Sequence, residues 1–222
     1  MMDQMEAIRA RHSVRHYQNK PLAPDVIAAL QQEIETLNRE SGLHIGLTVE
    51  EPGAFRNPIM HYGMFRGVRN YFTFACKKGA DLDEQIGYYG EKLVLFAQML
   101  GLNTCWVALT YSKRKLCAEL APDETVRMVI ALGYGETQGK QHKSRRLDEV
   151  CRTDGTMPEW FRRGVETALL APTAVNQQRF RFTLQGNTVQ AEALPGPCAK
   201  FDLGIVKLHF EIGAGIENFT WK

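Results

Sequence analysis

The chain has 222 residues, which is enough for one large domain or for two small lobes that share a core. Its apolar share of 44% and charged share of 23% are ordinary for a globular protein, and its formal net charge of +2 excludes a general polyanion binder. No apolar run approaches the roughly 18 residues of a membrane span, so we expect a cytoplasmic protein with no membrane partner.

The cysteines are odd in number and scattered, and no two of them form a CxxC pair; they are Cys76, Cys105, Cys117, Cys151 and Cys198. This pattern indicates reduced thiols rather than a disulfide framework or a zinc site. The six histidines are scattered as well and lack metal-ligand spacing, so we expect no metal site. The first residues, MMDQMEAIRARHS, lack the apolar region of a signal peptide and predict a short helix.

Hydrophobic periodicity and turn residues predict alternating helices and strands over the first two thirds of the chain. Helices are expected over 5–11, from Pro24 past Leu37, over 81–100 and over 112–120; strands are expected over 45–49, 68–76, 104–109 and 126–132. The helix over 81–100 gives the strongest signal, because its apolar residues share one side and Gly101 ends it. A basic, loop-like run follows over 140–146.

A second unit is expected from Leu147 onward. It contains a helix over 160–170, two strands over 180–184 and 188–191, and a last helix over about 202–214. Gln185-Gly186-Asn187 between the two strands is typical of a hairpin turn. This alternation of helices and strands places the chain in the α+β or α/β class.

Two helical segments of the chain can be overlaid without gaps. GEKLVLFAQMLGLN begins at Gly90, GIVKLHFEIGAGIE begins at Gly204, and each has a second glycine at the same distance, since 101 − 90 = 215 − 204. Each segment is followed by a tryptophan, Trp106 or Trp221. The overlay suits an internal duplication, and equally two unrelated amphipathic helices that both end at glycine.

Two basic clusters suit an anionic group. In Arg11-His12-Ser13-Val14-Arg15, two guanidinium groups and a hydroxyl occupy every second residue, which is the donor set that a phosphate monoester prefers. The second cluster is Lys143-Ser144-Arg145-Arg146. Each alone is also explained as a solvated basic run, and neither carries the interleaved aromatic residues of a single-stranded nucleic-acid site.

Two other segments carry candidate contacts. In APTAVNQQ at 171–178, Pro172 ends the preceding helix, and the polar side chains that follow suit the amide-like edge of an aromatic ring. The same residues would also make a capped turn whose side chains bond their own backbone. TCWVAL at 104–109 is, taken alone, a buried strand.

In this order, the segments resemble the FMN-dependent nitroreductase family over nearly the whole chain. RHSVR at 11–15 is similar to the family's Arg-x-Ser-x-Arg phosphate motif, and APTAVNQQ at 171–178 is similar to its Ala-Pro-Ser-x-x-Asn-x-Gln motif. GLNTCWV at 101–107 followed by VIALGYGE at 129–136 is similar to the family's late helix, strand and Gly-Tyr-Gly turn.

More narrowly, the chain resembles the branch in which two half-size units are fused. In the usual layout the Ala-Pro-Ser motif lies early in the chain and meets the flavin of the other subunit, whereas here its counterpart lies in the second half. The resemblance implies an α+β, nitroreductase-like fold with an antiparallel or mixed sheet flanked by helices. It also implies an internal duplication that forms a pseudo-dimer, with a phosphate-binding lobe over 1–150 and a smaller ring-contacting lobe over 151–222.

The resemblance further implies one FMN per chain, since no second Arg-x-Ser-x-Arg follows position 150. The residues expected at its phosphate are Arg11, His12, Ser13, Arg15, Lys143 and Arg145, with Arg146 as an alternate. Those expected at its isoalloxazine ring are Pro172, Thr173 and Asn176, and the backbone N–H groups of Val107, Ala108 and Leu109. Thr173 replaces the family's serine, and Arg179 stands where the family has tryptophan.

The resemblance implies that the flavin performs the chemistry without a catalytic side chain. The expected reaction is two-electron reduction of a small aromatic or quinone-like acceptor, with ping-pong hydride transfer from NAD(P)H. The expected partners are therefore NAD(P)H and the acceptor, without nucleic acid, in a chain that is monomeric or pairs into a homodimer. The loop over 51–66 is a candidate lid, with Met60, Tyr62, Met64 and Phe65 able to cover an aromatic acceptor.

Three alternatives stay open at this point. The chain could bind flavin without turnover, or it could carry out other flavin chemistry on the same fold, such as dehalogenation or flavin breakdown. It could also be a basic interaction module that uses both clusters on nucleic acid, in which case the protein would be colourless and its binding would weaken steeply with salt.

Overall fold

The computed structural model describes residues 2–56 and 65–222. They form two compact units, each of them discontinuous in sequence. Unit 1 comprises Ala10–Leu82 and Leu93–Lys140, and unit 2 comprises Met2–Arg9, Asp83–Lys92 and Gln141–Lys222. The contiguous lobes 1–150 and 151–222 stay a prediction.

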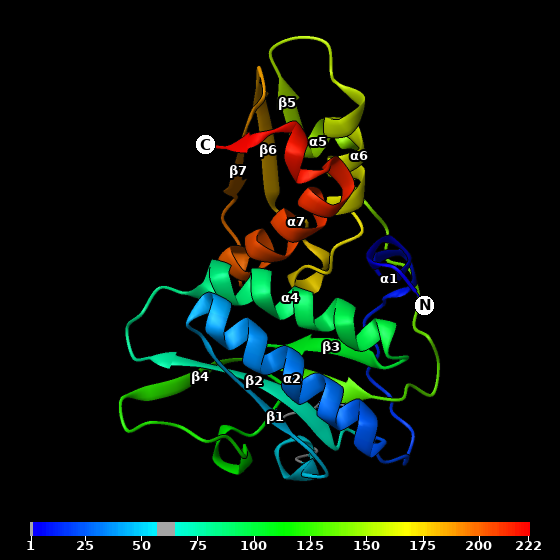
Figure 1. The fold of residues 1–222 in the computed structure, drawn as a ribbon, viewed down its shortest axis with the longest axis vertical. Helices are drawn as coiled ribbons and strands as arrows, with labels where there is room; N and C mark the ends of the chain where they lie inside the picture. Colours follow the sequence, from blue (N-terminus) through cyan, green and yellow to red (C-terminus); the bar gives the residue numbers. More distant parts are fainter. Residues whose placement is uncertain (1, 57–64) are drawn as a thin grey trace. The chain divides into compact units, whose positions relative to one another are not determined.

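Unit 1 is built on a four-stranded antiparallel sheet in the order β1-β2-β4-β3 (Figure 1). Its strands are β1 (His44–Thr48), β2 (Asn70–Lys77), β3 (Asn103–Val107) and β4 (Glu124–Gly133). The central strand β2 is rich in aromatic and small apolar residues, and all but its last residue are buried. Such a composition favours a strand with both faces covered.

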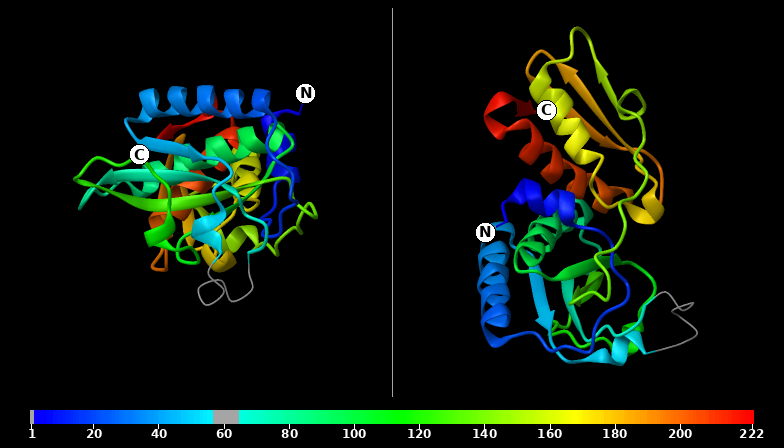
Figure 2. Two further views of the ribbon diagram at one scale, coloured as in Figure 1. Left: turned by 90° about the horizontal axis from the view of Figure 1, so that it is seen from below. Right: turned by 90° about the vertical axis from the view of Figure 1, so that its right-hand side faces the viewer.

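The two faces of this sheet are covered by different parts of unit 1. α2 (Pro24–Ser41) packs along β1 and buries Leu30, Ile34 and Leu37, and Figure 2 shows it lying across one side of the sheet. On the opposite side, Tyr71 of β2 and Val129 of β4 join an apolar cluster that includes Val14 and Tyr17. The segment with the first basic cluster is thereby fixed to the sheet by its apolar residues.

The outer edge of β1 is closed by a side chain of α2. The Asn38 side-chain Nδ2 atom donates to the Ile45 carbonyl at 3.0 Å, and the Asn38 Oδ1 atom accepts from the Ile45 N–H at 2.8 Å. The amide therefore bonds to both main-chain groups of Ile45, as a neighbouring strand would.

Unit 2 is built on a mixed sheet in the order β5-β6-β7-β8. Its strands are β5 (Cys151–Thr153), β6 (Phe180–Gln185), β7 (Thr188–Ala193) and β8 (Thr220–Trp221). β6 and β7 form an antiparallel hairpin, and the two outer strands pair parallel to it. Gly186 in the hairpin turn has φ +60°, a conformation that favours glycine.

Helices and an aromatic core complete unit 2. The helices are α1 (Gln4–Ala10), α5 (Leu147–Val150), α6 (Glu159–Ala168), α7 (Ala199–Ala214) and residues 83–92 of α4 (Asp83–Met99). α6 and α7 pack side by side, as the right-hand view of Figure 2 shows. Phe210 of α7 stacks on Phe182 of β6 with 4.6 Å between the ring centroids, so the helix pair is joined to the hairpin by aromatic contacts.

Residues 83–92 of α4 cross α7 at very short distance within unit 2. A Cβ added at Gly204 would lie 1.9 Å from the Glu84 carbonyl oxygen, and one added at Gly87 would lie 2.1 Å from the Phe201 carbonyl oxygen. Because any side chain at either position would meet backbone, glycine is what allows the two helices to approach this closely.

A buried polar pair lies beside this crossing. His209 of α7 and Glu91 of α4 are both fully buried, and the His209 Nε2 atom lies 3.0 Å from the Glu91 Oε1 atom. The other ring nitrogen of His209 lies 3.3 Å from the Thr167 carbonyl oxygen. Loss of one partner of such a pair leaves the other buried and uncompensated, so the pair fixes how α4, α6 and α7 fit together in this unit.

The predicted α+β fold with antiparallel and mixed sheets flanked by helices is confirmed. The helix predicted over 112–120 is wrong, since only the short 3₁₀ turn Lys113–Lys115 is helical there. The Cys117 N–H donates to the Tyr71 hydroxyl at 3.0 Å and its carbonyl accepts from the Thr48 hydroxyl at 2.8 Å, so tertiary bonds replace the helical ones. β5, β8 and α5 were not predicted.

The other 3₁₀ turns are Pro52–Phe55, Ala174–Asn176 and Ile216–Asn218. Met60, Tyr62 and Met64 of the candidate lid lie outside the described residues, and Phe65 packs on Phe55 with 5.6 Å between the ring centroids. Over the described residues, no helix combines the length and the apolar character that crossing a membrane requires.

The close crossing in unit 2 gives the first prediction. Gly204→Ala should lower the free energy of unfolding by about 2 kcal/mol or more, because the added methyl group meets the Glu84 carbonyl oxygen. Gly155→Ala is the matched control: its Cβ meets no atom within 4 Å, so a change within about 0.5 kcal/mol is expected. Urea unfolding followed by circular dichroism measures both, and equal effects would contradict the prediction.

Candidate functional site

The first basic cluster is an extended segment laid against strand β3 of unit 1. Ser13 forms a parallel bridge with Thr104, and the Val14 N–H donates to the Thr104 carbonyl at 3.0 Å. The Tyr17 hydroxyl donates to the Val14 carbonyl at 2.7 Å, and burial raises the pKa of Tyr17 well above its ordinary value, so the hydroxyl stays a donor. Main-chain bonds thus hold the segment against β3.

Three of the predicted phosphate ligands converge on one point of β3. Burial raises the pKa of the Cys105 thiol, and the charge of Arg15, the hydroxyl of Ser13 and the charge of Arg11 act in the opposite direction. The two guanidinium groups and the Ser13 hydroxyl therefore lie near enough to this sulfur to act on it. Arg11, Ser13 and Arg15 thus lie on the same part of β3, although burial outweighs their effect on the thiol itself.

These three side chains differ in their exposure. Arg11 is only 3% exposed, Ser13 is half-buried and Arg15 is exposed. In the described part of unit 1, Arg15 forms no ion pair with a carboxylate. The cluster therefore runs from a buried guanidinium group to an exposed one, which suits an anion that enters from solvent and is partly enclosed.

The loop after β4, residues 133–139, clamps this segment within unit 1. The Gln18 N–H donates to the Tyr134 carbonyl at 2.8 Å, and the Gly135 N–H donates to the Asn103 side chain at 2.9 Å. A Cβ added at Gly139, which has φ +76°, would lie 2.8 Å from the His12 Cβ atom. Gly139 therefore lets the loop lie directly against the basic segment.

The predicted backbone contacts lie where β3 ends. Val107 is the last residue that pairs with β4, and Ala108 and Leu109 continue beyond the ladder. Leu109 is 80% exposed, whereas Val107 is buried. The N–H groups of Ala108 and Leu109 are therefore outside the sheet, in contrast to the strand over 104–109 that the sequence predicts.

In unit 2, the basic loop and the Pro-Thr turn are joined by amide side chains. The Lys143 carbonyl accepts from Asn176 Nδ2 and from Gln178 Nε2, both at 2.9 Å. The Arg145 N–H donates to Gln178 Oε1 at 2.8 Å. The side chains of Lys143 and Arg145 remain exposed. Four of the residues that the sequence singles out here, Lys143, Arg145, Thr173 and Asn176, thus belong to one bonded cluster, with Gln178 at its centre.

Arg146, the alternate phosphate ligand, is bonded to two carboxylates that follow it in the chain. Its guanidinium group pairs with Asp148, and its own N–H donates to Glu149 at 2.9 Å at the start of α5. The side-chain hydrogen bond with Asp148 raises the pKa of Arg146. The bond to Glu149 caps the start of α5, and the ion pair with Asp148 balances the charge of the Arg146 guanidinium group.

The turn that follows Pro172 has a strained backbone. Val175, Asn176 and Gln178 have φ values of +46°, +54° and +46°, in the left-handed region that residues with a side chain rarely adopt. Each such residue costs roughly 1–2 kcal/mol, so the surroundings must hold the turn in place. The strain leaves Val175 90% exposed at the tip of the turn.

Asp202, in the first turn of α7, is hydrogen-bonded to the turn that follows Pro172. Its Oδ1 atom accepts from the Ala174 N–H at 2.9 Å, and its Oδ2 atom accepts from Gln177 Nε2 at 2.6 Å. Asp202 is only 4% exposed, and burial raises its pKa to about 6, although the bonds from Gln177 and Ala174 lower it. A carboxylate is thus buried with neutral N–H donors as its bonded partners.

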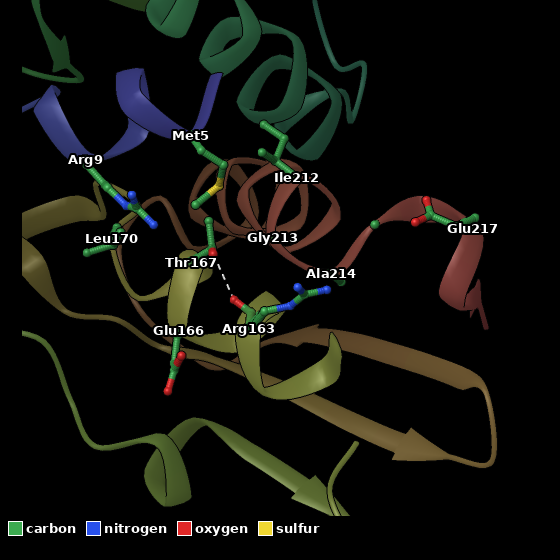
Figure 3. Close-up of a pocket in the computed structure, with 11 residues that line it drawn as sticks. Met5, Arg9, Arg163, Glu166, Thr167, Leu170, Ile212, Gly213, Ala214 and Glu217 are labelled. Atoms are coloured by element: carbon green, nitrogen blue, oxygen red, sulfur yellow. Dashed lines mark hydrogen bonds between the residues drawn. The ribbon is translucent and has the colours of Figure 1, made fainter. Parts of the chain in front are cut away.

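Unit 2 also contains a cavity of about 470 Å³ that includes none of the predicted site residues. It lies between α1 and the carboxyl ends of α6 and α7, and Figure 3 shows Arg9 and Arg163 on different walls of it. Glu166 and Glu217 also line it, so its charges are mixed. In unit 1, a second cavity of about 700 Å³ lies along β1 and residues 116–119, again away from the basic segment.

Comparison with known protein families identifies one family. A family model described as "Putative TM nitroreductase" matches residues 3–214. The chain belongs to this nitroreductase family. A comparison with curated proteins gives no match.

Solved structures show the same fold. A nitroreductase from Thermotoga maritima is 23% identical, with a TM-score of 0.66 over 96% of this chain and 83% of that one. A nitroreductase family protein from Streptococcus pneumoniae is 12% identical, with a TM-score of 0.53 over 67% of this chain and 98% of that one. A protein from Desulfovibrio desulfuricans described as a "putative nitroreductase in complex with fmn" is 19% identical, with a TM-score of 0.48 over 66% of this chain and 93% of that one. At these identities the likeness supports the fold alone.

Sequence reasoning missed three residues that organise the two clusters. Gln178 was included only among the polar side chains of 171–178, Cys105 only as a reduced thiol within a predicted strand, and Asp202 only as the start of the predicted last helix. A signal existed for Asp202, because it is a carboxylate in the first turn of a helix, within the mostly apolar stretch FDLGIV. For Gln178 the motif similarity marks the position but not its partners, which lie 33 and 35 residues away along the chain.

Gln178 gives a prediction for unit 2. Gln178→Ala should lower the free energy of unfolding by about 1–3 kcal/mol, because it leaves the Arg145 N–H without its buried acceptor. The Arg145 amide should also exchange with solvent faster, as native-state hydrogen exchange would measure. Gln185→Ala changes an exposed glutamine at the end of β6 and serves as the control, with no change at Arg145. Unaltered exchange at Arg145 in both variants would contradict the role given to Gln178.

Proposed function

We propose that the chain is an FMN-dependent oxidoreductase of the nitroreductase type, which reduces a small aromatic or quinone-like acceptor with electrons from NAD(P)H. The observation that carries this proposal is the convergence of Arg11, Ser13 and Arg15 on one point beside β3. Membership of the nitroreductase family supports it independently.

The chemistry of this donor set fits the phosphate of FMN. A phosphate monoester carries a charge of about −1.5 to −2 at pH 7 and three strong acceptor oxygens. Arg11 and Arg15 supply two positive charges with forked N–H donors, and Ser13 supplies a hydroxyl between them. These three residues therefore match the charge and the acceptor oxygens of the FMN phosphate, and His12 lies between Arg11 and Ser13 in the sequence.

The contacts to the isoalloxazine ring are proposed from the similarity of 171–178 to the family motif and from the place where β3 ends. When bound, FMN would supply the two-electron redox chemistry. Ala108 and Leu109 would offer backbone N–H groups beyond the end of β3, next to Val107. Pro172, Thr173 and Asn176 would border the ring, and Lys143 and Arg145 would add positive charge. None of these residues needs to exchange a proton with the substrate in this proposal.

In the proposed reaction NAD(P)H and the acceptor occupy the same place in turn. That order gives ping-pong kinetics, with parallel lines in double-reciprocal plots. We place the enzyme in the cytoplasm, where its five cysteines would stay reduced, and all five are free thiols in the structure. The chain would act as a monomer or as a homodimer.

We also propose that the fold arose by internal duplication. The order helix, strand, strand, helix, glycine, strand occurs twice, as α2-β1-β2-α4-Gly101-β3 and as α6-β6-β7-α7-Gly215-β8, and both glycines have φ +79°. A crystal structure in which the two sets of elements superpose poorly would exclude this origin.

The visible spectrum of the purified protein is the decisive experiment. The proposal predicts flavin absorption that is released by heat as FMN, and NAD(P)H oxidation that depends on an added nitroaromatic or quinone. A preparation that stays colourless after soaking with excess FMN would reject the proposal. A yellow protein that never oxidises NAD(P)H would instead be a flavin-binding protein without turnover.

Arg15 gives a prediction for the phosphate site. Arg15→Gln should weaken FMN binding about 10- to 100-fold, because one charged hydrogen bond of roughly 1.5–3 kcal/mol is lost. Riboflavin, which lacks the phosphate, should bind the variant and the wild-type protein equally well. Arg39→Gln, at an exposed arginine of α2, is the matched control and should leave both affinities unchanged. Quenching of flavin fluorescence measures all of these, and a parallel loss of riboflavin affinity would argue against a phosphate role.

A further inference from the structure

The Pro-Thr turn has an anchor that lies outside its own sequence. Ala174 and Gln177 are bonded to the two carboxylate oxygens of Asp202, which is 25 to 28 residues further along the chain. Between these two attachment points lie Val175 and Asn176, both in the left-handed region. The carboxylate therefore holds the two ends of the strained part of the turn.

The remaining attachments of the turn are neutral hydrogen bonds. The Gln178 N–H donates to the Thr173 hydroxyl at 3.0 Å, and the Asn176 and Gln178 amides bond to the Lys143 carbonyl. Asp202 supplies the group with a full charge, and hydrogen bonds to charged groups are roughly twice as strong as neutral ones. Loss of that charge should therefore loosen the turn more than loss of any one neutral bond.

We propose that Asp202 is the positioning residue for the flavin-ring contacts at Pro172, Thr173 and Asn176, and that it acts through Ala174 and Gln177. The inference rests on the proposed function, because the turn matters to catalysis only where it meets the ring. Asp202 does not touch the ring in this scheme; it fixes the backbone conformation that presents the contacts.

The proposal makes the turn sensitive to pH. Burial holds the pKa of Asp202 at about 6, so the carboxyl is ionised at pH 7.5 and protonated at pH 5. A protonated carboxyl turns one of its oxygens into a donor, which then faces an N–H group instead of accepting from it. Affinity for the ring should therefore fall as the pH drops through about 6.

Other ionisable groups surround Asp202 without supplying a balancing charge. The Cys198 thiol precedes α7, and its pKa is raised by burial and by the charges of Asp202 and Asp83. The Arg179 guanidinium, after the turn, donates to the Pro195 carbonyl. In the residues that the structure describes, the groups that lower the pKa of Asp202 are the neutral donors of Gln177 and Ala174.

Riboflavin is the probe for the binding test, because the phosphate of FMN itself titrates near pH 6. Asp202→Asn should raise the dissociation constant of riboflavin about tenfold or more at pH 7.5. Wild-type protein should lose affinity with a midpoint near pH 6, and Asp202→Asn should show no such transition. Asp154→Asn, at an exposed aspartate of unit 2, is the control and should behave as wild type.

Hydrogen exchange on the flavin-free protein tests the anchoring directly. In Asp202→Asn the protection factor of the Ala174 amide should fall about tenfold, while amides of the β6–β7 ladder keep theirs. Gln177→Ala keeps the Ala174 bond and serves as the milder variant, with a smaller loss of riboflavin affinity in the same direction. It also keeps the test open if Asp202→Asn does not fold, as near-ultraviolet circular dichroism would reveal.

The two arms separate this inference from the proposed function. Wild-type protein that binds neither FMN nor riboflavin rejects the proposed function, and the exchange at Ala174 then decides the anchoring alone. Wild-type protein that binds flavin, with unchanged riboflavin affinity and unchanged Ala174 protection in Asp202→Asn, overturns the positioning role while the proposed function stands.

Discussion

The candidate phosphate site depends on the main-chain attachment of the basic segment, which reaches β3 through the bond from the Val14 N–H to the Thr104 carbonyl. Because backbone groups make this attachment, the segment is held beside β3 whatever its side chains do. Val14 and Tyr17 then enter the apolar cluster behind it, and the alternation of an extended chain directs the neighbouring polar residues elsewhere. A binding site for a charged group needs such rigid support, since a mobile guanidinium group would lose much of its binding energy to ordering.

The two clusters use different means of support. In unit 1 the basic segment is held by a strand, a glycine-rich loop and apolar packing. In unit 2 the loop and the turn are held by side chains instead: Gln178, Asn176 and Asp202 bond to their backbone groups. Such a network fixes a conformation sharply while it is complete, and it suffers more from the loss of one member.

Long periodic segments and local turn chemistry were readable from the sequence, and relations across long distances were not. The helix α4, the hairpin β6-β7 and the helix α7 follow from apolar spacing and from Gly101, Gly186 and Gly215, whose positive φ values suit their places at turns and helix ends. The segment 112–120 has a helical composition, yet Tyr71 and Thr48 bind its backbone and override that preference. For the site, the sequence supplied the ligand types, whereas the convergence on Cys105 and the anchoring by Asp202 depend on folding.

The amide of Asn38 has a consequence for how the protein behaves at high concentration. An outermost strand with unsatisfied main-chain groups is a template on which another chain can add, and that route leads to aggregates. By bonding both main-chain groups of Ile45, the second residue of β1, Asn38 occupies part of this edge with a side chain that cannot propagate a ladder. This part of the strand edge is thereby closed by a side chain of α2, the same helix that buries Leu30, Ile34 and Leu37.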